Sequence, residues 1–199
     1  MSTQPLRVGM FGGAFDPPHH AHVALARAAV DQLRLGKLHV VPTGDAWHKA
    51  RTLTAAHHRL HMARLAFAGL PHVVVDGREL ARSGPTYSID TLRELQAEQP
   101  EAQLVLLMGE DQAAGFTRWQ AWPEIARLAV LGVAGRGTGA GLAALRALAG
   151  VRVEALQLPQ MPVSATDIRA RLTAGQDIAE LVPPAVASYI ESQHLYQAT

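Results

Sequence analysis

Residues 12–22 read Gly-Gly-Ala-Phe-Asp-Pro-Pro-His-His-Ala-His and follow directly on the apolar run of residues 6–11. This order predicts a strand, a stiffened turn and the start of a helix, which is the repeating unit of an α/β fold. The two glycines let the backbone approach a ligand closely. His19 and His22 fall three apart, on one face of the predicted helix. Because helix N-termini attract phosphate groups, the stretch predicts phosphate-ester chemistry.

The same residues admit two other interpretations. Strand–glycine–helix turns occur in many α/β proteins that have no catalytic role there, with the histidines as ordinary helix caps. Alternatively, His19, His22 and Asp16 could bind a metal ion, but the chain has no cysteine and no obvious further ligand. The combination of turn, close backbone approach, rigid loop and paired donors favours phosphate chemistry. It also resembles the signature of the nucleotidyltransferase superfamily, in which a histidine–any–glycine–histidine element ends the loop; here Ala21 replaces the glycine.

Length and composition indicate one domain with a sizeable core. The chain has 199 residues, 48% of them hydrophobic, and its net charge of +1 gives no basis for a nucleic-acid-coating surface. The absence of cysteine excludes disulfides and thiolate metal sites and fits a cytosolic protein. The first residues lack the apolar segment of a signal peptide, and no apolar run approaches the roughly 20 residues that span a bilayer. We therefore expect a cytoplasmic protein with neither nucleic-acid nor membrane partners; the sequence predicts no oligomeric state.

Strand-like and helix-like segments alternate along the whole chain. Apolar runs predict strands over residues 6–11, 38–42, 73–75, 103–108, 128–134 and 151–155. Helices are expected over residues 20–35, 55–68, 88–99 with Ser88 as the N-cap, 141–149, 164–173 and 184–193. This alternation predicts a doubly wound, Rossmann-like parallel sheet with helices on both faces. Residues 1–199 would form a single domain, in which residues 164–199 are a C-terminal helical segment, and ligands would bind beyond the carboxyl ends of the strands.

A second candidate anion site lies at residues 162–169, which read Pro-Val-Ser-Ala-Thr-Asp-Ile-Arg. A Ser/Thr-rich helix start followed by arginine brings hydroxyls, backbone amides and a guanidinium together, which suits the outer phosphates of a nucleotide. The alternative is a plain capping motif, with Ser164 as N-cap and Asp167 three residues later. Alone, the motif favours capping. Together with the histidine loop it favours phosphate binding, because the same superfamily carries a similar Ser-x-Thr-x-Ile-Arg element.

Three further segments carry residues that suit a nucleotide site. Residues 84–88 form a turn into a helix, residues 108–111 end a strand in acidic side chains, and residues 116–122 contain Trp119 and Trp122. Each also has a neutral interpretation: a capped helix, a strand end and two core tryptophans. An aromatic side chain in a nucleotide enzyme can equally stack on a heterocycle.

Together these segments resemble one family, the bacterial nicotinate-nucleotide adenylyltransferases, over nearly the whole chain and in the expected order. The chain departs from the family pattern at Ala14, where threonine is usual, at Thr43, where asparagine is usual, and at Ala46-Trp47, where two prolines usually precede His-Lys. The last two departures concern contacts to the mononucleotide phosphate rather than the reaction. The matching elements are residues 12–22, Pro42, His48-Lys49, Arg59, Met62, residues 84–87, Gly109-x-Asp111, Phe116-x-x-Trp119, Ser164-x-Thr166-x-Ile168-Arg169, Val182-Pro183, Tyr189-Ile190 and Leu195-Tyr196.

The resemblance implies transfer of AMP from ATP to nicotinate mononucleotide in NAD biosynthesis, with deamido-NAD and pyrophosphate as products. It implies that His19, His22 and Arg169 are catalytic and that Mg²⁺ bridges phosphate oxygens, without metal-ligating side chains of its own. The residues implied to bind ATP are Gly12, Gly13, Phe15, His19, His22, Gly109, Asp111, Ser164, Thr166 and Arg169. Those implied to bind the mononucleotide are Asp16, His48, Lys49, Thr86, Tyr87, Ser88, Trp119 and Gln120.

Other patterns leave alternatives. Residues 135–140 match the relaxed dinucleotide fingerprint, with Glu154 about where a ribose-binding acid belongs, which would suit an NAD-binding oxidoreductase or a non-catalytic nucleotide sensor. Their surplus glycines are more typical of a surface loop. His57 and His61 fall four apart on a predicted helix and could bind zinc, although solvated histidines are commoner. Within the superfamily, the phosphate acceptor could be phosphopantetheine, against which residues 84–88 and 116–119 argue.

Overall fold

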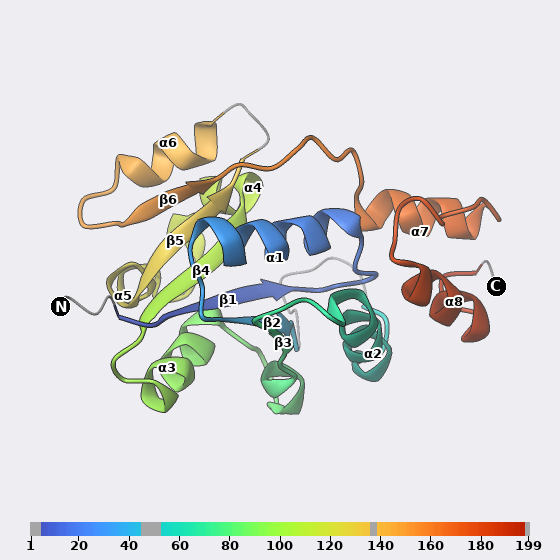
Figure 1. The fold of residues 1–199 in the computed structure, drawn as a ribbon, viewed down its shortest axis with the longest axis horizontal. Helices are drawn as coiled ribbons and strands as arrows, with labels where there is room; N and C mark the ends of the chain where they lie inside the picture. Colours follow the sequence, from blue (N-terminus) through green and yellow to red (C-terminus); the bar gives the residue numbers. More distant parts are fainter. Residues whose placement is uncertain (1–4, 45–52, 136–138, 198–199) are drawn as a thin grey trace.

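The six strands of the described chain form one sheet in which every neighbouring pair is parallel (Figure 1). The computed structural model describes residues 5–44, 53–135 and 139–197. The strand order β3-β2-β1-β4-β5-β6 confirms the predicted doubly wound arrangement. The strands are β1 (Arg7–Gly13), β2 (Lys37–Pro42), β3 (Val73–Val75), β4 (Gln103–Gly109), β5 (Ala129–Ala134) and β6 (Val153–Leu156).

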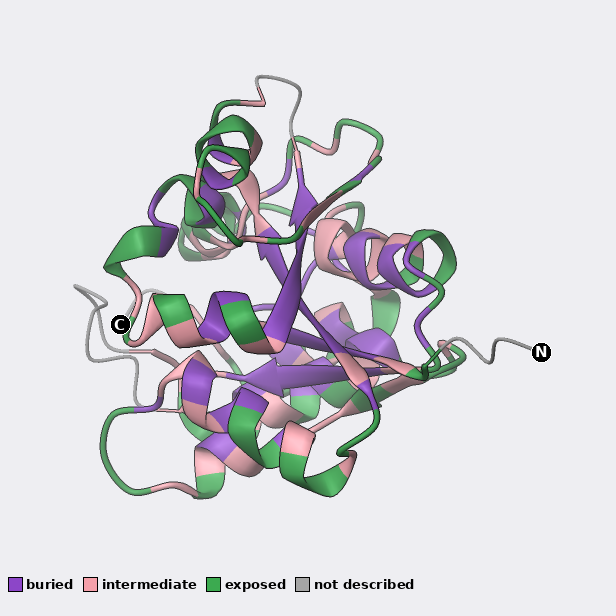
Figure 2. Ribbon diagram, turned by 90° about the vertical axis from the view of Figure 1, so that its left-hand side faces the viewer, coloured by how far each residue is buried: buried purple, intermediate pink, exposed green. Residues whose placement is uncertain are grey.

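Helices cover both faces of this sheet, so its central strands are buried on both sides (Figure 2). One face packs against α1 (His20–Gln32), α2 (Ala56–Phe67), α7 (Ala165–Thr173) and α8 (Pro184–Ser192). The other packs against α3 (Ser88–Glu98), α4 (Glu110–Ala114), α5 (Trp122–Leu128) and α6 (Ala140–Arg146). Two 3₁₀ turns, η1 (Arg78–Ala81) and η2 (Phe116–Arg118), precede α3 and α5. Because both faces are covered, β4 and β5 are almost continuous apolar runs.

The C-terminal helices complete the core beside the loop that follows β1. Ile168 of α7 and Val186 of α8 belong to the same buried cluster as Phe11 of β1 and Leu25 of α1. Figure 1 shows α7 and α8 beyond the end of the β1 arrow, with α8 next to α2, which it contacts. The end of the chain thus returns to the edge of the sheet at which the first loop lies.

The predicted elements are present, with shifted ends. β1 continues through Gly12 and Gly13, so these glycines end the strand rather than open the loop. The prediction that Ser88 is an N-cap is wrong: Ser88 is the first residue of α3, and Tyr87 holds the cap position without a side-chain cap hydrogen bond. The helices α4 and α5 and both 3₁₀ turns are too short to show a helical period in the sequence. Across the three described ranges, no helix has the length and apolarity needed to cross a membrane.

Candidate functional site

The direction of the strand order changes between β1 and β4, because the chain runs from β1 to β2 and β3 on one side and adds β4, β5 and β6 on the other. In doubly wound sheets, ligands bind at such a point, beyond the carboxyl ends of the strands. A cavity of about 1080 Å³ lies there. Its walls come from the end of β1 and the following loop, the first turn of α1, the start of α4, residues 157–166 and Arg169 of α7.

The first turn of α1 fixes the two predicted catalytic histidines relative to each other. His19 is the N-cap of α1 and is 6% exposed. Its backbone N–H donates to Nδ1 of His22 at 3.2 Å, and the two rings stack with centroids 3.7 Å apart. Because Nδ1 of His22 accepts a hydrogen bond, a neutral His22 ring carries its proton on Nε2. Both side chains line the cavity, so the structure brings together two imidazoles, of which His22 is a donor through Nε2.

Phe15 shapes the loop from inside the core. Its ring is 1% exposed and lies edge-on to Phe11 and Phe67, with centroid separations of 5.4 Å and 5.6 Å. A Cβ atom on Gly13 would lie 3.0 Å from this ring, so glycine at position 13 lets the ring pack beneath the loop. Phe15 itself has a φ of 48°, in the left-handed region. Phe15 is thus both a core residue and one of the residues that line the cavity.

The start of α7 forms a second wall of the cavity. The Ser164 hydroxyl accepts from the Asp167 N–H at 3.1 Å and donates to the Asp167 carboxylate at 2.6 Å, so Ser164 does cap the helix. Arg169 donates through Nη2 to the Thr166 hydroxyl at 3.1 Å and through Nη1 to the Asp16 carbonyl at 2.7 Å. The guanidinium therefore bridges α7 and the loop after β1. Asp16, Ser164, Thr166 and Arg169 all line the cavity, whereas Asp167 does not.

The end of β4 supplies the opposite wall. Gly109 is the N-cap of α4, and its N–H donates to the side-chain oxygen of Gln112 at 3.1 Å. Asp111 is exposed and lines the cavity, as does Glu110, for which the sequence predicts no role. All residues predicted to bind ATP therefore line one cavity: Gly12, Gly13, Phe15, His19, His22, Gly109, Asp111, Ser164, Thr166 and Arg169.

Known proteins are similar to this chain over most of its length. The cytidylyltransferase-like family model matches residues 10–171. This chain belongs to that family. A protein of Albidiferax ferrireducens named "Probable nicotinate-nucleotide adenylyltransferase" is 54% identical over 194 residues, covering 96% of this chain and 98% of its own. A protein of Methylibium petroleiphilum with the same name is 43% identical, covering 98% and 95%. These relatives place the chain among the nicotinate-nucleotide adenylyltransferases within the family.

Solved structures share the fold of this adenylyltransferase family member. A Plasmodium falciparum nicotinic acid mononucleotide adenylyltransferase complexed with NaAD superposes with a TM-score of 0.78, covering 96% of this chain and 97% of its own. The two sequences are only 18% identical. At that identity the likeness shows a common α/β architecture and does not by itself transfer a binding site.

The residues predicted to bind the mononucleotide are not gathered in the same way. His48 and Lys49 lie outside the described residues. Among the others, Asp16 lines the cavity, whereas the lining does not include Thr86, Tyr87, Ser88, Trp119 or Gln120. In this adenylyltransferase the structure therefore gathers the residues of the predicted phosphate end in one cavity, whereas those of the predicted pyridine end lie outside its lining, around the starts of α3 and α5.

These loops are packed rather than open. Trp119 is half-buried against Phe116, with ring centroids 5.9 Å apart, and Gln120 beside it is exposed. Thr86 is 8% exposed and lies against Gly44. A Cβ atom on Gly44 would lie 2.8 Å from the Thr86 methyl group and 2.3 Å from the carbonyl oxygen of Glu79. The loop before α3 thus rests on residue 44 through a contact that only glycine allows.

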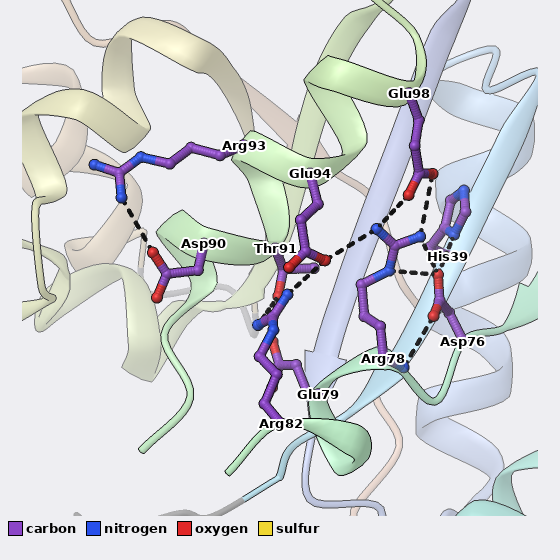
Figure 3. A network of polar contacts seen from close by, with 10 residues as sticks. All are labelled: His39, Asp76, Arg78, Glu79, Arg82, Asp90, Thr91, Arg93, Glu94 and Glu98. Carbon is purple, nitrogen blue, oxygen red and sulfur yellow. Dashed lines mark hydrogen bonds and ion pairs between the residues drawn. The ribbon is translucent and has the colours of Figure 1, made fainter. Parts of the chain in front are cut away.

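A polar network links η1 with α3, the elements that flank this loop in sequence (Figure 3). Glu79 is 4% exposed and accepts hydrogen bonds from the Thr91 hydroxyl, at 2.8 Å, and from the Gly44 N–H. Burial raises the pKa of Glu79 despite these bonds. Arg82 donates to the Thr91 hydroxyl at 2.9 Å and pairs with Glu94 at 2.7 Å. The network therefore joins η1, α3 and the end of β2 into one unit.

Asp76, directly after the edge strand β3, extends the network to His39 of the neighbouring strand β2. Nδ1 of His39 lies 2.8 Å from its carboxylate, and Arg78 lies 2.7 Å from it. Burial opposes the ionisation of Asp76, but the hydrogen bonds from Arg78 and His39 prevail and lower its pKa to about 2. Burial also lowers the pKa of His39, so near neutral pH this ring is an uncharged donor to Asp76. These ionisable groups belong to the scaffold of the loop and do not line the cavity.

Asp16 has a structural role that the sequence does not predict. It is 1% exposed. Its carboxylate accepts hydrogen bonds from the Tyr196 hydroxyl at 2.6 Å and the Thr54 N–H at 3.3 Å, in addition to the Arg169 bond to its carbonyl. The predicted contact with the mononucleotide would therefore come from a side chain already held by two protein donors.

Arg59 of α2 is also a buried charge, and the sequence predicts no role for it. It is 3% exposed, and its guanidinium donates to the carbonyl oxygens of Thr54, Ala14 and Thr43 at 2.9 Å, 3.0 Å and 2.8 Å. It joins the loop after β1 to the segments after β2 and before α2. The signal in the sequence is its position in the family pattern; its partners are backbone carbonyls, which no sequence motif reveals.

The alternative sites have little support in the described chain. His57 and His61 are exposed on α2, and the His61 ring stacks on Tyr189 with centroids 4.4 Å apart. No group of three or more histidine and carboxylate side chains that could hold a metal ion occurs in the described ranges. Gly135 lines the cavity, but residues 136–138 of the dinucleotide pattern lie outside the described residues. That pattern also follows β5, whereas a dinucleotide fingerprint belongs after the first strand.

Proposed function

We propose that the protein transfers AMP from ATP to nicotinate mononucleotide, giving deamido-NAD and pyrophosphate in NAD biosynthesis. The observation that carries the proposal is the convergence of His19, His22 and Arg169 on one cavity at the carboxyl ends of β1 and β4. The names of the full-length relatives specify the acceptor. We also propose that residues 1–199 act as a single nucleotidyltransferase domain in the cytoplasm, which the shared core cluster of α1, α2, α7 and α8 and the lack of cysteine support.

The reaction needs alignment more than proton transfer. The phosphate of the mononucleotide is already anionic when it attacks the α-phosphorus of ATP, so no general base is required. Catalysis then consists of holding the two phosphates in line and stabilising the charge that builds on the α- and β-oxygens. The pair of stacked histidines at the start of α1 suits this task, because Nε2 of His22 is a hydrogen-bond donor.

The outer phosphates of ATP would be held at α7. Arg169 is preoriented by its bonds to Thr166 and to the Asp16 carbonyl, and a guanidinium can contact two phosphate oxygens at once. Ser164 would act mainly by ordering the first turn of α7, since its hydroxyl is bonded to Asp167. Gly109 and Asp111 at the start of α4 would contact the ribose of the adenosine, as the family resemblance implies.

Mg²⁺ would be bound chiefly by ATP itself. The described residues offer no cluster of carboxylates for a metal, and the Asp16 carboxylate at the cavity accepts two bonds from protein donors. A site with few side-chain oxygens to ligate a metal suits Mg²⁺, which commonly keeps several waters and binds through substrate phosphates. When bound, Mg²⁺ would neutralise part of the triphosphate charge.

The acceptor would lie toward the loops before α3 and α5. The backbone amides of Thr86, Tyr87 and Ser88 would receive the carboxylate of the pyridine ring, and Trp119 would stack on the ring, with Asp16, His48, Lys49 and Gln120 completing the contacts. Support comes from the family resemblance and from α3, an eleven-residue helix without a side-chain cap at its N-terminus. Helix N-termini present unsatisfied N–H groups and favour anions.

Pyrophosphate release tests the proposal. The protein would be incubated with Mg²⁺–ATP and, in turn, nicotinate mononucleotide, nicotinamide mononucleotide and phosphopantetheine. We expect rapid release with the nicotinate form alone. Release with phosphopantetheine in its place would identify a different adenylyltransferase, and ATP binding without release for any acceptor would identify a nucleotide sensor.

A further inference from the structure

Tyr196, near the end of the described chain, reaches the loop after β1. Its hydroxyl donates to Oδ1 of Asp16 at 2.6 Å, across 180 positions of sequence. Burial, together with the adjacent Asp16 carboxylate, raises the pKa of Tyr196, so the phenol is protonated and donates. A short bond to a carboxylate is of the strong, charge-assisted kind.

The backbone around Tyr196 holds this side chain in place. Its φ of 64° lies in the left-handed region, and its carbonyl accepts from the Thr173 hydroxyl of α7 at 3.2 Å. The preceding Leu195 N–H donates to the Ile190 carbonyl of α8 at 3.0 Å. The phenol therefore extends from a turn that is itself tied to both C-terminal helices.

Asp16 transmits this contact to the proposed site. Tyr196 donates to the side chain of Asp16, and Arg169 donates to the backbone carbonyl of the same residue, at 2.7 Å. Thr54, before α2, donates its N–H to the other carboxylate oxygen at 3.3 Å. Because a buried carboxylate is costly unless it is hydrogen-bonded, loss of one donor would lead Asp16 to move or to recruit another partner, and the bond to Arg169 would change with it.

We propose that Tyr196 is a positioning residue for adenylyl transfer: through Asp16 it holds the loop after β1 and the Arg169 guanidinium in their relative places. The inference rests on the proposed function, and it adds a residue from the C-terminal turn to a site built from β1, α4 and α7. Tyr196 does not line the cavity, so its effect on the reaction is indirect.

The test compares two tyrosines of the same C-terminal segment. Tyr189 is half-buried like Tyr196, and its hydroxyl also makes a side-chain hydrogen bond, to Nδ1 of His58 at 2.8 Å. Tyr189→Phe therefore removes a tyrosine hydroxyl and its side-chain hydrogen bond from α8 without touching Asp16. For Tyr196→Phe we expect kcat to fall about tenfold or more, because small misplacements in an alignment-dependent site have large effects on rate. For Tyr189→Phe we expect kcat within about twofold of the parent, the variation typical of substitutions away from special contacts.

Two further measurements separate positioning from loss of fold and from failure of the proposed function. Thermal unfolding of both variants reports general damage, and calorimetric Mg²⁺–ATP affinity reports the placement of Arg169 without turnover. A loss of kcat or of ATP affinity that Tyr189→Phe does not share supports the proposal. Equal losses in both variants, or none in Tyr196→Phe, overturn it. If the parent protein releases no pyrophosphate with any acceptor, the proposed function fails, and the ATP affinities alone decide the role of Tyr196.

A double-mutant cycle with Asp16→Asn tests the route of the effect. If Tyr196 acts through Asp16, the two losses in kcat will be less than multiplicative, as for residues in direct contact. Multiplicative losses would show that Tyr196 acts by a path independent of Asp16 and would overturn the proposal.

Discussion

The phosphate end and the pyridine end of the proposed site are built in different ways. At the phosphate end, the loop after β1, the start of α4 and the start of α7 line one cavity. At the pyridine end, residues 86–88 lie beside the polar network of Figure 3, and Trp119 packs against Phe116 on a separate loop. The first arrangement follows from topology, because the carboxyl ends of β1 and β4 are neighbours in the sheet. The second depends on single contacts, such as that of Gly44 with Thr86.

This difference predicts which kinetic constants respond to substitution. Changes at the phosphate end alter groups that we propose face the reacting phosphates, so they should act on turnover and on the constants for ATP. Changes at the pyridine end should act on the constants for the mononucleotide. A substitution at the phosphate end that changed only the mononucleotide constants, or one at the pyridine end that changed only the ATP constants, would show that the two ends are not separate.

The largest effect that we predict is the choice between acid and amide at the pyridine end. The first turn of α3 has no side-chain cap, and Asp90 in that turn is paired with Arg93 at 3.1 Å. The N–H donors there would form charge-assisted bonds with a carboxylate, whereas the NH₂ group of an amide would face them unpaired. We expect kcat/KM to favour nicotinate over nicotinamide mononucleotide by about 10⁴–10⁵, the range that buried polar mismatch produces. Both acceptors would be compared at saturating Mg²⁺–ATP, and equal efficiencies would refute this account of specificity.

At the phosphate end, His22→Ala should lower kcat far more than it weakens ATP binding. Removal of one donor that acts on the transition state costs about 10²–10³ in rate. The matched control is His20→Ala, which removes a partly exposed imidazole from the same turn of α1. Steady-state kinetics and ATP affinity would be measured for both variants. Turnover of His22→Ala close to that of the control would contradict the catalytic role of His22.

The same contrast limits what the sequence can predict. The strands and the order of the βα units follow from apolar periodicity, and the topology then determines which strand ends meet. The residues predicted to bind ATP come from the glycine–histidine loop and the family resemblance, and they lie together because those strand ends meet. The pyridine end follows only from family resemblance, because the support of Thr86 by Glu79 and Gly44 leaves no periodic signal. The contact between Tyr196 and Asp16 spans 180 positions, and the partners of Arg59 are backbone carbonyls. Neither can be inferred before the fold is known.

Arg169→Lys should weaken ATP binding more than mononucleotide binding. Lysine is a point charge and cannot contact two oxygens as the guanidinium does, nor bridge Thr166 and the Asp16 carbonyl with the same geometry. We expect the apparent ATP constant to rise on the order of tenfold, since a hydrogen bond to a charged group contributes about 1.5–3 kcal/mol. Arg171→Lys, on the exposed side of α7, is the control. If only the mononucleotide constant moved, Arg169 would belong to the pyridine end.

The smallest predicted effect distinguishes a stacking role from a core role for Trp119. Trp119 and Trp122 both pack against Phe116 with ring centroids 5.9 Å apart, so Trp122→Ala is a control for lost packing. If Trp119 stacks on the pyridine ring, Trp119→Ala should weaken mononucleotide binding by about 0.5–1.5 kcal/mol, the contribution of an aromatic pair, and leave ATP affinity unchanged. Trp122→Ala should lower the melting temperature without that selective loss. If both variants lower the melting temperature equally and neither changes the mononucleotide constant, Trp119 is a core residue and the pyridine ring must be bound elsewhere on these loops.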